Sequence, residues 1–156
     1  MASAAAEPVH VSIARRFAFP LSDGYDYITS LERWPEYWPN RIRLDPESRW
    51  SQPGDTARLT LRLLGRPTEL VMTLSRIVPY RLVEYTSEQR GLPTASHERH
   101  FAEDRGGFSY RIAVELERRS GLRRPFDRLV VRGAVERAGR TTLDNLERRF
   151  AELAAS

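Results

Sequence analysis

Apolar and polar residues alternate through most of the chain between Thr56 and Leu116. Successive side chains of a β-strand point to opposite faces, so this period of two indicates strands with one buried face. Residues typical of turns separate the alternating segments: Gly65-Arg66-Pro67, Val78-Pro79, Gly91-Leu92-Pro93 and Asp104-Arg105-Gly106-Gly107. This pattern predicts a run of antiparallel strands joined by short turns.

The segments on either side of this run complete the fold class. Val9 to Ala14 alternates in the same way and predicts a further strand. Pro20 begins a short helix, and the aromatic stretch from Leu31 to Pro39 predicts a second short helix or turn. Pro125 to Ala154 predicts one long helix, whose apolar stripe consists of Leu143, Leu146, Phe150 and Leu153. This order is α+β, with helices on one face of an antiparallel sheet.

Length and composition are typical of one globular domain. The 156 residues suit a single domain, predicted for residues 9–154 after a flexible tail at 1–8. No apolar run approaches the roughly 20 residues of a membrane span, and the first residues lack a secretory signal pattern, so a cytoplasmic location is expected. Cysteine is absent, which excludes disulfides, thiolate catalysis and thiolate metal sites.

The positive charge of the chain does not indicate a nucleic-acid partner. All 25 basic residues are arginine, a bias that a GC-rich bacterial genome would produce. They alternate with 21 acidic residues, whereas a phosphate-binding surface gathers its charge into a patch. The one local basic cluster, Arg118 to Arg124, is expected to be a solvated loop. We therefore expect no nucleic acid and no integral membrane contact.

The alternation also predicts which side chains form the inner face of the sheet. They are Leu59, Leu61, Leu63, Leu70, Met72, Leu74, Phe108, Tyr110, Ile112 and Val114, and the long helix faces them with Leu129, Val135, Leu143 and Leu146. Because protein interiors pack densely, most of these side chains are expected simply to fill one core. Gly133 and Gly139 predict that the first half of the helix bends or packs closely against a neighbouring element.

Two titratable side chains are predicted on the same inner face. Period two places His97 and Arg99 on the side of Phe101, which is expected to face inward. A buried guanidinium needs an anion. Glu84 or Glu136 could supply this anion in an ion pair, or a ligand could supply it as a carboxylate or phenolate. If Arg99 instead lies at a water-filled mouth of the cavity, water solvates its charge and no anion is needed. His97 could donate to a ligand oxygen or act as a general base, so Arg99 and His97 are the candidate catalytic residues.

Aromatic side chains supply further candidate ligand contacts. Trp38 could stack on a planar ligand, whereas Trp34 is expected to anchor the short helices on the sheet. Tyr25, Tyr85 and Tyr110 could each offer a hydroxyl to a ligand or complete the core. The three histidines have no spacing typical of a zinc site, and the chain has no phosphate loop, dinucleotide fingerprint or nucleophile elbow. No metal and no cofactor are therefore expected.

The chain resembles a known group of proteins in both its element order and several short stretches. The stretches are Phe19-Pro20, Leu31-Glu32-Arg33-Trp34-Pro35-Glu36-Tyr37-Trp38-Pro39, Leu64-Gly65-Arg66, Val78-Pro79-Tyr80-Arg81-Leu82 and Thr142-Leu143-Asp144-Asn145-Leu146-Glu147. They are similar to those of the START-like (SRPBCC) superfamily, and of its polyketide cyclase/dehydrase family in particular. The resemblance implies a helix-grip fold, in which a curved sheet of about six or seven strands wraps around the long C-terminal helix and encloses an apolar cavity.

The resemblance also implies a function. It favours a protein that binds a hydrophobic small molecule (a lipid, isoprenoid or polyketide), as a monomer or homodimer. The alternatives are a polyketide aromatase/cyclase or dehydratase and a protein-interaction module without a ligand. Ile77 occupies the position at which the similar cyclases carry a cavity arginine, with Arg76 beside it facing the other way. The expected ligand contacts are Tyr25, Trp38, Leu59, Leu61, Met72, Tyr85, His97, Arg99, Tyr110, Ile112, Glu136 and Leu143.

Overall fold

The computed structural model describes residues 8–63, 65–90, 92–117 and 125–156, with the backbone alone for residues 63 and 125–128. The predictions for the N-terminal tail, for the Arg118 to Arg124 cluster and for the side chain of Leu63 lie outside the described residues. Among the described helices, none combines the length and the apolar character that crossing a membrane requires.

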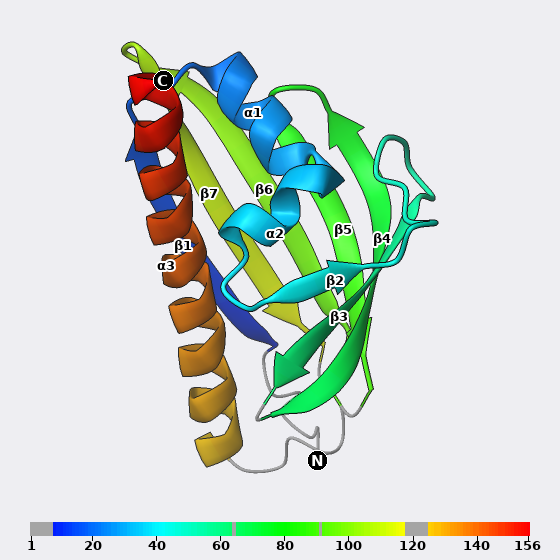
Figure 1. Cartoon of the computed structure of the whole chain (residues 1–156). Coiled ribbons are helices and arrows are strands. Elements are labelled where there is room, and N and C mark those ends of the chain that lie inside the picture. The colour runs from blue at the N-terminus through cyan, green and yellow to red at the C-terminus, as the bar shows by residue number, and fades with distance from the viewer. Residues whose placement is uncertain (1–7, 64, 91, 118–124) are drawn as a thin grey trace.

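Seven antiparallel strands form one sheet in the order β1-β7-β6-β5-β4-β3-β2 (Figure 1). The strands are β1 (Val9–Phe17), β2 (Ile42–Leu44), β3 (Thr56–Leu63), β4 (Arg66–Val78), β5 (Leu82–Gln89), β6 (Ala95–Asp104) and β7 (Gly107–Leu116). The helices are α1 (Leu21–Thr29), the 3₁₀ turn η1 (Leu31–Arg33), α2 (Trp34–Tyr37) and α3 (Pro125–Ala155). The predicted α+β class and helix-grip architecture are confirmed.

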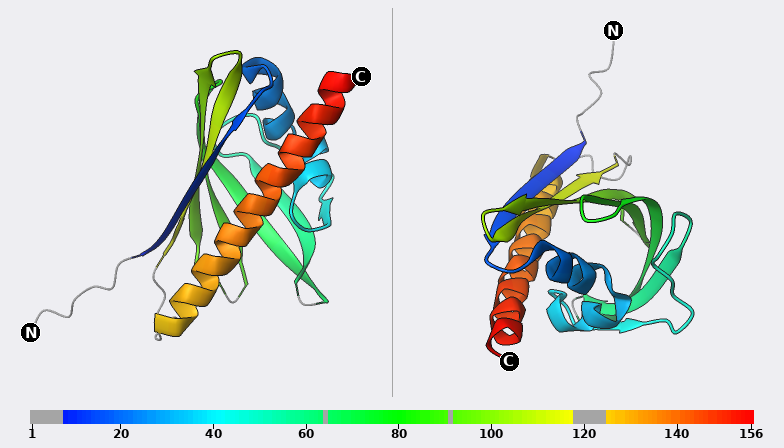
Figure 2. Two further views of the ribbon diagram at one scale, coloured as in Figure 1. Left: turned by 90° about the vertical axis from the view of Figure 1, so that its left-hand side faces the viewer. Right: turned by 90° about the horizontal axis from the view of Figure 1, so that it is seen from above.

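The sheet is curved, and its concave face holds all the helices. Seen from above, the strands curl around α1 and α2, while α3 runs obliquely along the side of β1 (Figure 2). The register aligns the predicted apolar positions across neighbouring strands, for example Leu59 with Leu70 and Phe101 with Tyr110. The short strand β2 was not predicted, because three residues are too few to display an alternating pattern.

The second half of α3 closes the core. Leu143, Leu146 and Phe150 are at most 4% exposed, as the predicted stripe requires. Leu129 contradicts the prediction, because 68% of its surface is exposed at the other end of the helix. Helical spacing identifies which residues share a face but not how far a neighbour covers that face, and the described part of the sheet does not cover the first turns of α3.

A glycine sets the distance between α3 and the sheet. A Cβ atom built at Gly139 would collide with the side chain of Ile13 on β1. The predicted close approach of this half of the helix is therefore confirmed at Gly139. At Gly133, by contrast, an added Cβ meets no described atom within 4 Å, so this glycine is not required by packing against the described residues.

The short helices are fastened by polar contacts as well as by burial. Trp34 donates from Nε1 to the carbonyl of Ile28 at 3.1 Å, and the Tyr37 hydroxyl donates to the same carbonyl at 2.6 Å. Tyr27 and Arg149 each bond to Glu36, which joins α1, α2 and α3. Trp34 is thus the anchor that the sequence predicted, and the short helices form a fixed cover on the concave face.

Candidate functional site

His97 and Arg99 lie on the concave face of the sheet, on strand β6. Arg99 pairs in register with Val83 and Ile112, which are both buried core residues. The intervening side chains point the other way, and His100 Nε2 lies 2.8 Å from Glu98 Oε2 on the outer face. The uninterrupted alternation of β6 therefore turns two titratable side chains inward, each of them half-buried.

Tyr85 on β5 holds both side chains. Arg99 donates from Nη2 to the Tyr85 hydroxyl at 2.7 Å, and its Cζ lies 5.4 Å from the centroid of the Tyr85 ring. The imidazole of His97 stacks on the same ring, with centroids 4.4 Å apart and planes only 6° from parallel. On its far side, His97 Nε2 lies 2.8 Å from the hydroxyl of Ser87. The contacts fix the orientation of both groups without using all their nitrogens.

One nitrogen of each side chain has no partner among the described residues. Arg99 Nη1 and His97 Nδ1 are both buried, and no described atom forms a hydrogen bond with either of them. The ion pair considered from the sequence is wrong, because Glu84 lies 3.8 Å from Arg76 and Glu136 lies 3.3 Å from Arg132 instead. Buried polar atoms are almost always hydrogen-bonded, so two such atoms on adjacent side chains need an explanation.

The electrostatics of this cluster favour a charged arginine beside a neutral histidine. Burial acts to lower the pKa of Arg99, but the oxygens of Tyr85, Tyr110 and Tyr37 outweigh it and raise that pKa. Burial, with a smaller contribution from Arg99, lowers the pKa of His97 well below its ordinary value. Burial also raises the pKa values of Tyr85 and Tyr110, so these phenols stay protonated. The guanidinium charge therefore faces hydroxyl groups rather than an anion.

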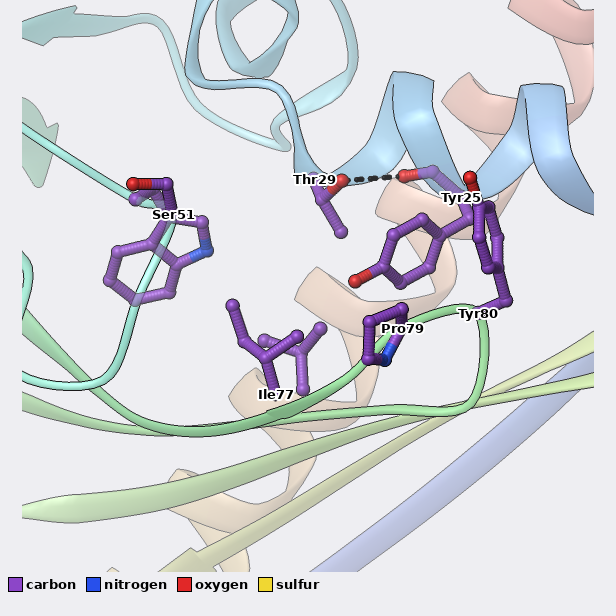
Figure 3. A pocket seen from close by; sticks show the side chains of 8 residues that line it. Tyr25, Thr29, Ser51, Ile77, Pro79 and Tyr80 are labelled. Carbon is purple, nitrogen blue, oxygen red and sulfur yellow. Dashed lines mark hydrogen bonds between the residues drawn. The ribbon is translucent and has the colours of Figure 1, made fainter.

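The other predicted ligand contacts fall into different environments. Seven are buried core residues with at most 8% exposure: Leu59, Leu61, Met72, Tyr85, Tyr110, Ile112 and Leu143. Trp38 is half-buried and stacks on Trp34 with ring centroids 5.6 Å apart. Glu136 is half-buried in its pair with Arg132 on α3. Tyr25 lines a hollow of about 270 Å³ beside α1, together with Trp50, Val83 and the other residues labelled in Figure 3.

Ile77, which the resemblance places where similar cyclases carry an arginine, lies near the end of β4. Ile77 packs against the core. The side chain of Arg76 beside it is 61% exposed, and its Nη1 lies 3.8 Å from Glu84 Oε1. The register of β4 and β5 shifts between Leu74 and Arg76. The Ser75 hydroxyl donates to the backbone of Glu84 at 2.9 Å. The inward guanidinium thus comes from β6 rather than from β4.

Sequence reasoning missed two residues of this region. Ser87, the polar partner of His97, follows Tyr85 at period two and is the one buried polar residue in the described part of the chain. Trp50 packs edge-on against Tyr85 at 5.3 Å from the loop between β2 and β3. A large aromatic residue within the otherwise polar stretch from Glu47 to Asp55 was the available signal. No three His, Asp or Glu side chains gather as a metal site would need, within the residues described.

The lowered pKa of His97 leads to a prediction about pH. Below about pH 6.5 the unfolded chain binds a proton at this residue and the folded chain does not, so stability rises with pH in that window. We expect the free energy of unfolding to fall on acidification from pH 7 to 5, by up to about 1.4 kcal/mol per pH unit more than in His97→Gln. Urea unfolding at a series of pH values measures this, and parallel profiles for the two proteins would contradict it.

Comparison with solved structures supports the fold. CV1439 from Chromobacterium violaceum has a TM-score of 0.75 at 12% identity, covering 91% of this chain and 96% of that one. Ara h 8.0201 has a TM-score of 0.73 at 14% identity, covering 92% and 97%. The di-domain ARO/CYC StfQ from the steffimycin biosynthetic pathway has a TM-score of 0.72 at 16% identity, covering 96% of this chain but 53% of StfQ. At these identities the likeness shows the fold alone.

Sequence comparison identifies the family. No curated protein matches the chain. A family described as polyketide cyclase/dehydrase and lipid transport matches residues 8–151, which covers nearly every described element. This match agrees with the helix-grip architecture and with the resemblance seen in the sequence. The chain therefore belongs to the polyketide cyclase/dehydrase and lipid transport family of the SRPBCC superfamily.

Proposed function

We propose that the protein binds a hydrophobic small molecule between the curved sheet and α3, with an oxygen of the ligand bonded to Arg99 and His97. A lipid, an isoprenoid or a polyketide has the required character. The observation that carries this proposal is a pair of buried nitrogens, Arg99 Nη1 and His97 Nδ1, that have no hydrogen-bond partner in the described part of the chain. In a site that awaits a ligand, such atoms are the ones that the ligand satisfies.

The charge of the cluster defines the polar end of the ligand. An arginine can only donate hydrogen bonds, so the partner of Nη1 is an acceptor. The neighbouring tyrosines are neutral, so an anionic oxygen gains more than a neutral one from the guanidinium. A carboxylate, a phenolate or the enolate of a β-diketone fits this requirement. His97, held neutral beside it, offers Nδ1 as a second contact.

The surroundings define the rest of the ligand. Ile112 and Val83 flank Arg99 on the neighbouring strands, and Tyr37 and Tyr110 face it. All four are almost fully buried, so the walls offer apolar surface and aromatic faces. A few convergent polar groups within an apolar lining are typical of sites for hydrophobic small molecules. The half-buried state of Arg99 and His97 indicates accessible space beside them.

Binding is a better explanation of this geometry than acid–base catalysis. A general base is most effective when its pKa lies near the working pH, and burial takes the pKa of His97 well below that range. The aromatase/cyclase alternative is favoured by one contact, the charged hydrogen bond from Arg99 to Tyr85, because such a pair could polarise a ligand carbonyl. Formation of an aromatic product from a poly-β-ketone would support that alternative.

Thermal unfolding against a ligand panel tests the proposal. Fatty acids, isoprenoids and aromatic polyketides are added to wild type and to Arg99→Gln at about 100 times the dissociation constant. At this concentration a bound ligand adds roughly 2.7 kcal/mol to the stability of the folded state. We expect anionic members of the panel to raise the unfolding midpoint of wild type and to leave that of Arg99→Gln nearly unchanged.

The outer face of the sheet supplies a matched control. Arg111 lies on the neighbouring strand β7, paired with His100, and is exposed. Arg111→Gln removes the same charge and leaves the concave face intact, so its midpoint is expected to shift as in wild type. If no member of the panel shifts wild type, or if all three proteins respond equally, binding at Arg99 is excluded. An interaction module would then be the better explanation.

A further inference from the structure

Ser87 on β5 is a polar residue within the apolar core. It is 8% exposed, and its partners in register on the neighbouring strands, Met72 on β4 and Ala95 on β6, are both buried. Its hydroxyl lies 2.8 Å from His97 Nε2 and forms no other hydrogen bond with a described residue. Alanine would occupy the same position without a polar atom to satisfy. The hydroxyl is therefore best explained by its effect on His97.

The hydrogen bond between Ser87 and His97 can run in two directions. A neutral imidazole carries one proton, so one ring nitrogen donates and the other accepts. Burial lowers the pKa of His97 well below its ordinary value, so the neutral form is the relevant one at pH 7. The ring is stacked on Tyr85 with planes 6° from parallel, which keeps Nε2 directed at the serine.

Counting the protons decides between the two directions. If Nε2 donates to Ser87, the buried serine O–H has no acceptor among the described residues, and the lone pair of Nδ1 has no donor. If Nε2 accepts from Ser87, the serine O–H is satisfied and only the N–H at Nδ1 remains. An unpartnered buried polar group costs free energy, so the second direction is favoured. The bond made by one ring nitrogen thus decides which nitrogen carries the proton.

We propose that Ser87 sets the ligand specificity of the Arg99 cluster by holding the imidazole proton of His97 on Nδ1. Nδ1 and Arg99 Nη1, which no described residue satisfies, are then both donors. A group that accepts at two atoms and has no proton to donate matches them, and a carboxylate is such a group. The tautomer is a property of the ligand-free protein, whereas the specificity for a carboxylate rests on the proposed function.

The same tautomer acts against other chemistry at this position. An alcohol can accept from either nitrogen, but its own O–H is then left with the Tyr85 oxygen, which already accepts from Arg99 Nη2. Protonated Nδ1 has no lone pair, so it can donate to a ligand but cannot take a proton from one. The general-base role that the sequence suggested for His97 is therefore not available at this atom.

Heteronuclear NMR of the histidine rings tests the tautomer in the ligand-free protein. At pH 7 we expect wild type to show His97 with a protonated Nδ1 and an unprotonated Nε2, and His97→Gln identifies its signals. Ser87→Ala is expected to lose this single form, whereas Ser87→Thr, which keeps a hydroxyl, is expected to retain it. Ser96→Ala is the matched control, because Ser96 is exposed on β6 in register with Thr86, away from the concave face.

Titration with decanoate and decanol tests the specificity. The two probes have the same chain and differ only in the polar end. Wild type is expected to bind decanoate more tightly than decanol. Ser87→Ala is expected to reduce this preference about fivefold, the value of one hydrogen bond. Ser87→Thr and Ser96→Ala are expected to keep the wild-type ratio of affinities within about twofold.

The outcomes separate this inference from the proposed function. A wild-type His97 with its proton on Nε2 would overturn the inference and leave binding at Arg99 intact. The same conclusion follows if wild type binds decanoate and Ser87→Ala has an equal preference for it. If neither probe binds wild type, specificity for a carboxylate is overturned together with binding of a fatty acid at Arg99, and only the tautomer stands.

Discussion

Phe150→Ala is expected to lower the free energy of unfolding by about 3–5 kcal/mol, the range for removing a fully buried phenylalanine. Phe150 is 4% exposed and lies where α3 meets the sheet and the short helices. Its ring contacts four others, and the centroid distances are 5.1 Å to Phe17, 4.5 Å to Phe19, 5.6 Å to Tyr27 and 5.9 Å to Phe108. Truncation would leave a cavity between elements that cannot all collapse to fill it.

Leu129 on the same helix provides the matched control. It is 68% exposed, so Leu129→Ala is expected to change the free energy of unfolding by no more than about 0.5 kcal/mol. Both variants are measured by urea unfolding at constant pH. Equal losses for the two substitutions would mean that the first turns of α3 are packed as firmly as the last, against the arrangement described.

Arg99→Met combined with Tyr85→Phe is expected to leave the ligand-free protein at least as stable as wild type. A buried charge without an ionic partner carries a large desolvation cost, and replacing such groups by apolar ones of similar size is often neutral or stabilising, by up to about 4 kcal/mol. Tyr85 must change together with Arg99, because Arg99→Met alone would leave the buried Tyr85 hydroxyl without its partner.

The unfolding midpoint of this double variant, with and without a fatty acid, checks the prediction. A gain in stability together with a lost response to the ligand would indicate that Arg99 serves binding, because residues of functional sites often lower the stability of the folded protein. A loss of several kcal/mol would instead assign Arg99 a structural role in the core. The single variant Tyr85→Phe shows how much of any change comes from the tyrosine.

Local patterns predicted the parts of this molecule that depend on one segment at a time. The alternation along β6 correctly predicted that the side chains of His97 and Arg99 lie on the concave face, because a strand without a bulge keeps its two-residue period. The stripe on α3 identified Leu143, Leu146 and Phe150 as core residues for the same reason. Position along the chain was enough to decide which face each of these residues occupies.

Contacts between distant segments could not be predicted in this way. Glu136 looked like a possible partner for Arg99, but it lies 3.3 Å from Arg132 on its own helix. Glu84, by contrast, alternates with the buried Val83 and Tyr85 on β5, so period two already places it on the outer face beside Arg76. Trp50 reaches Tyr85 from a loop whose path no periodicity describes. The exposure of Leu129 depends on where the sheet ends beneath the helix. These relationships arise from tertiary packing rather than from local pattern.

The most direct test of binding at Arg99 compares two fluorescent probes that differ by one charged group. Anilinonaphthalene sulfonate is anionic, and N-phenylnaphthylamine has the same rings without the sulfonate. Both are titrated into wild type and into the double variant Arg99→Met and Tyr85→Phe. A hydrogen bond to a charged group contributes about 1.5–3 kcal/mol, so we expect the sulfonate probe to bind at least tenfold more weakly without Arg99. The neutral probe is expected to change less than twofold. Equal affinities of the sulfonate probe for the two proteins would contradict the assignment of Arg99 as the ligand contact.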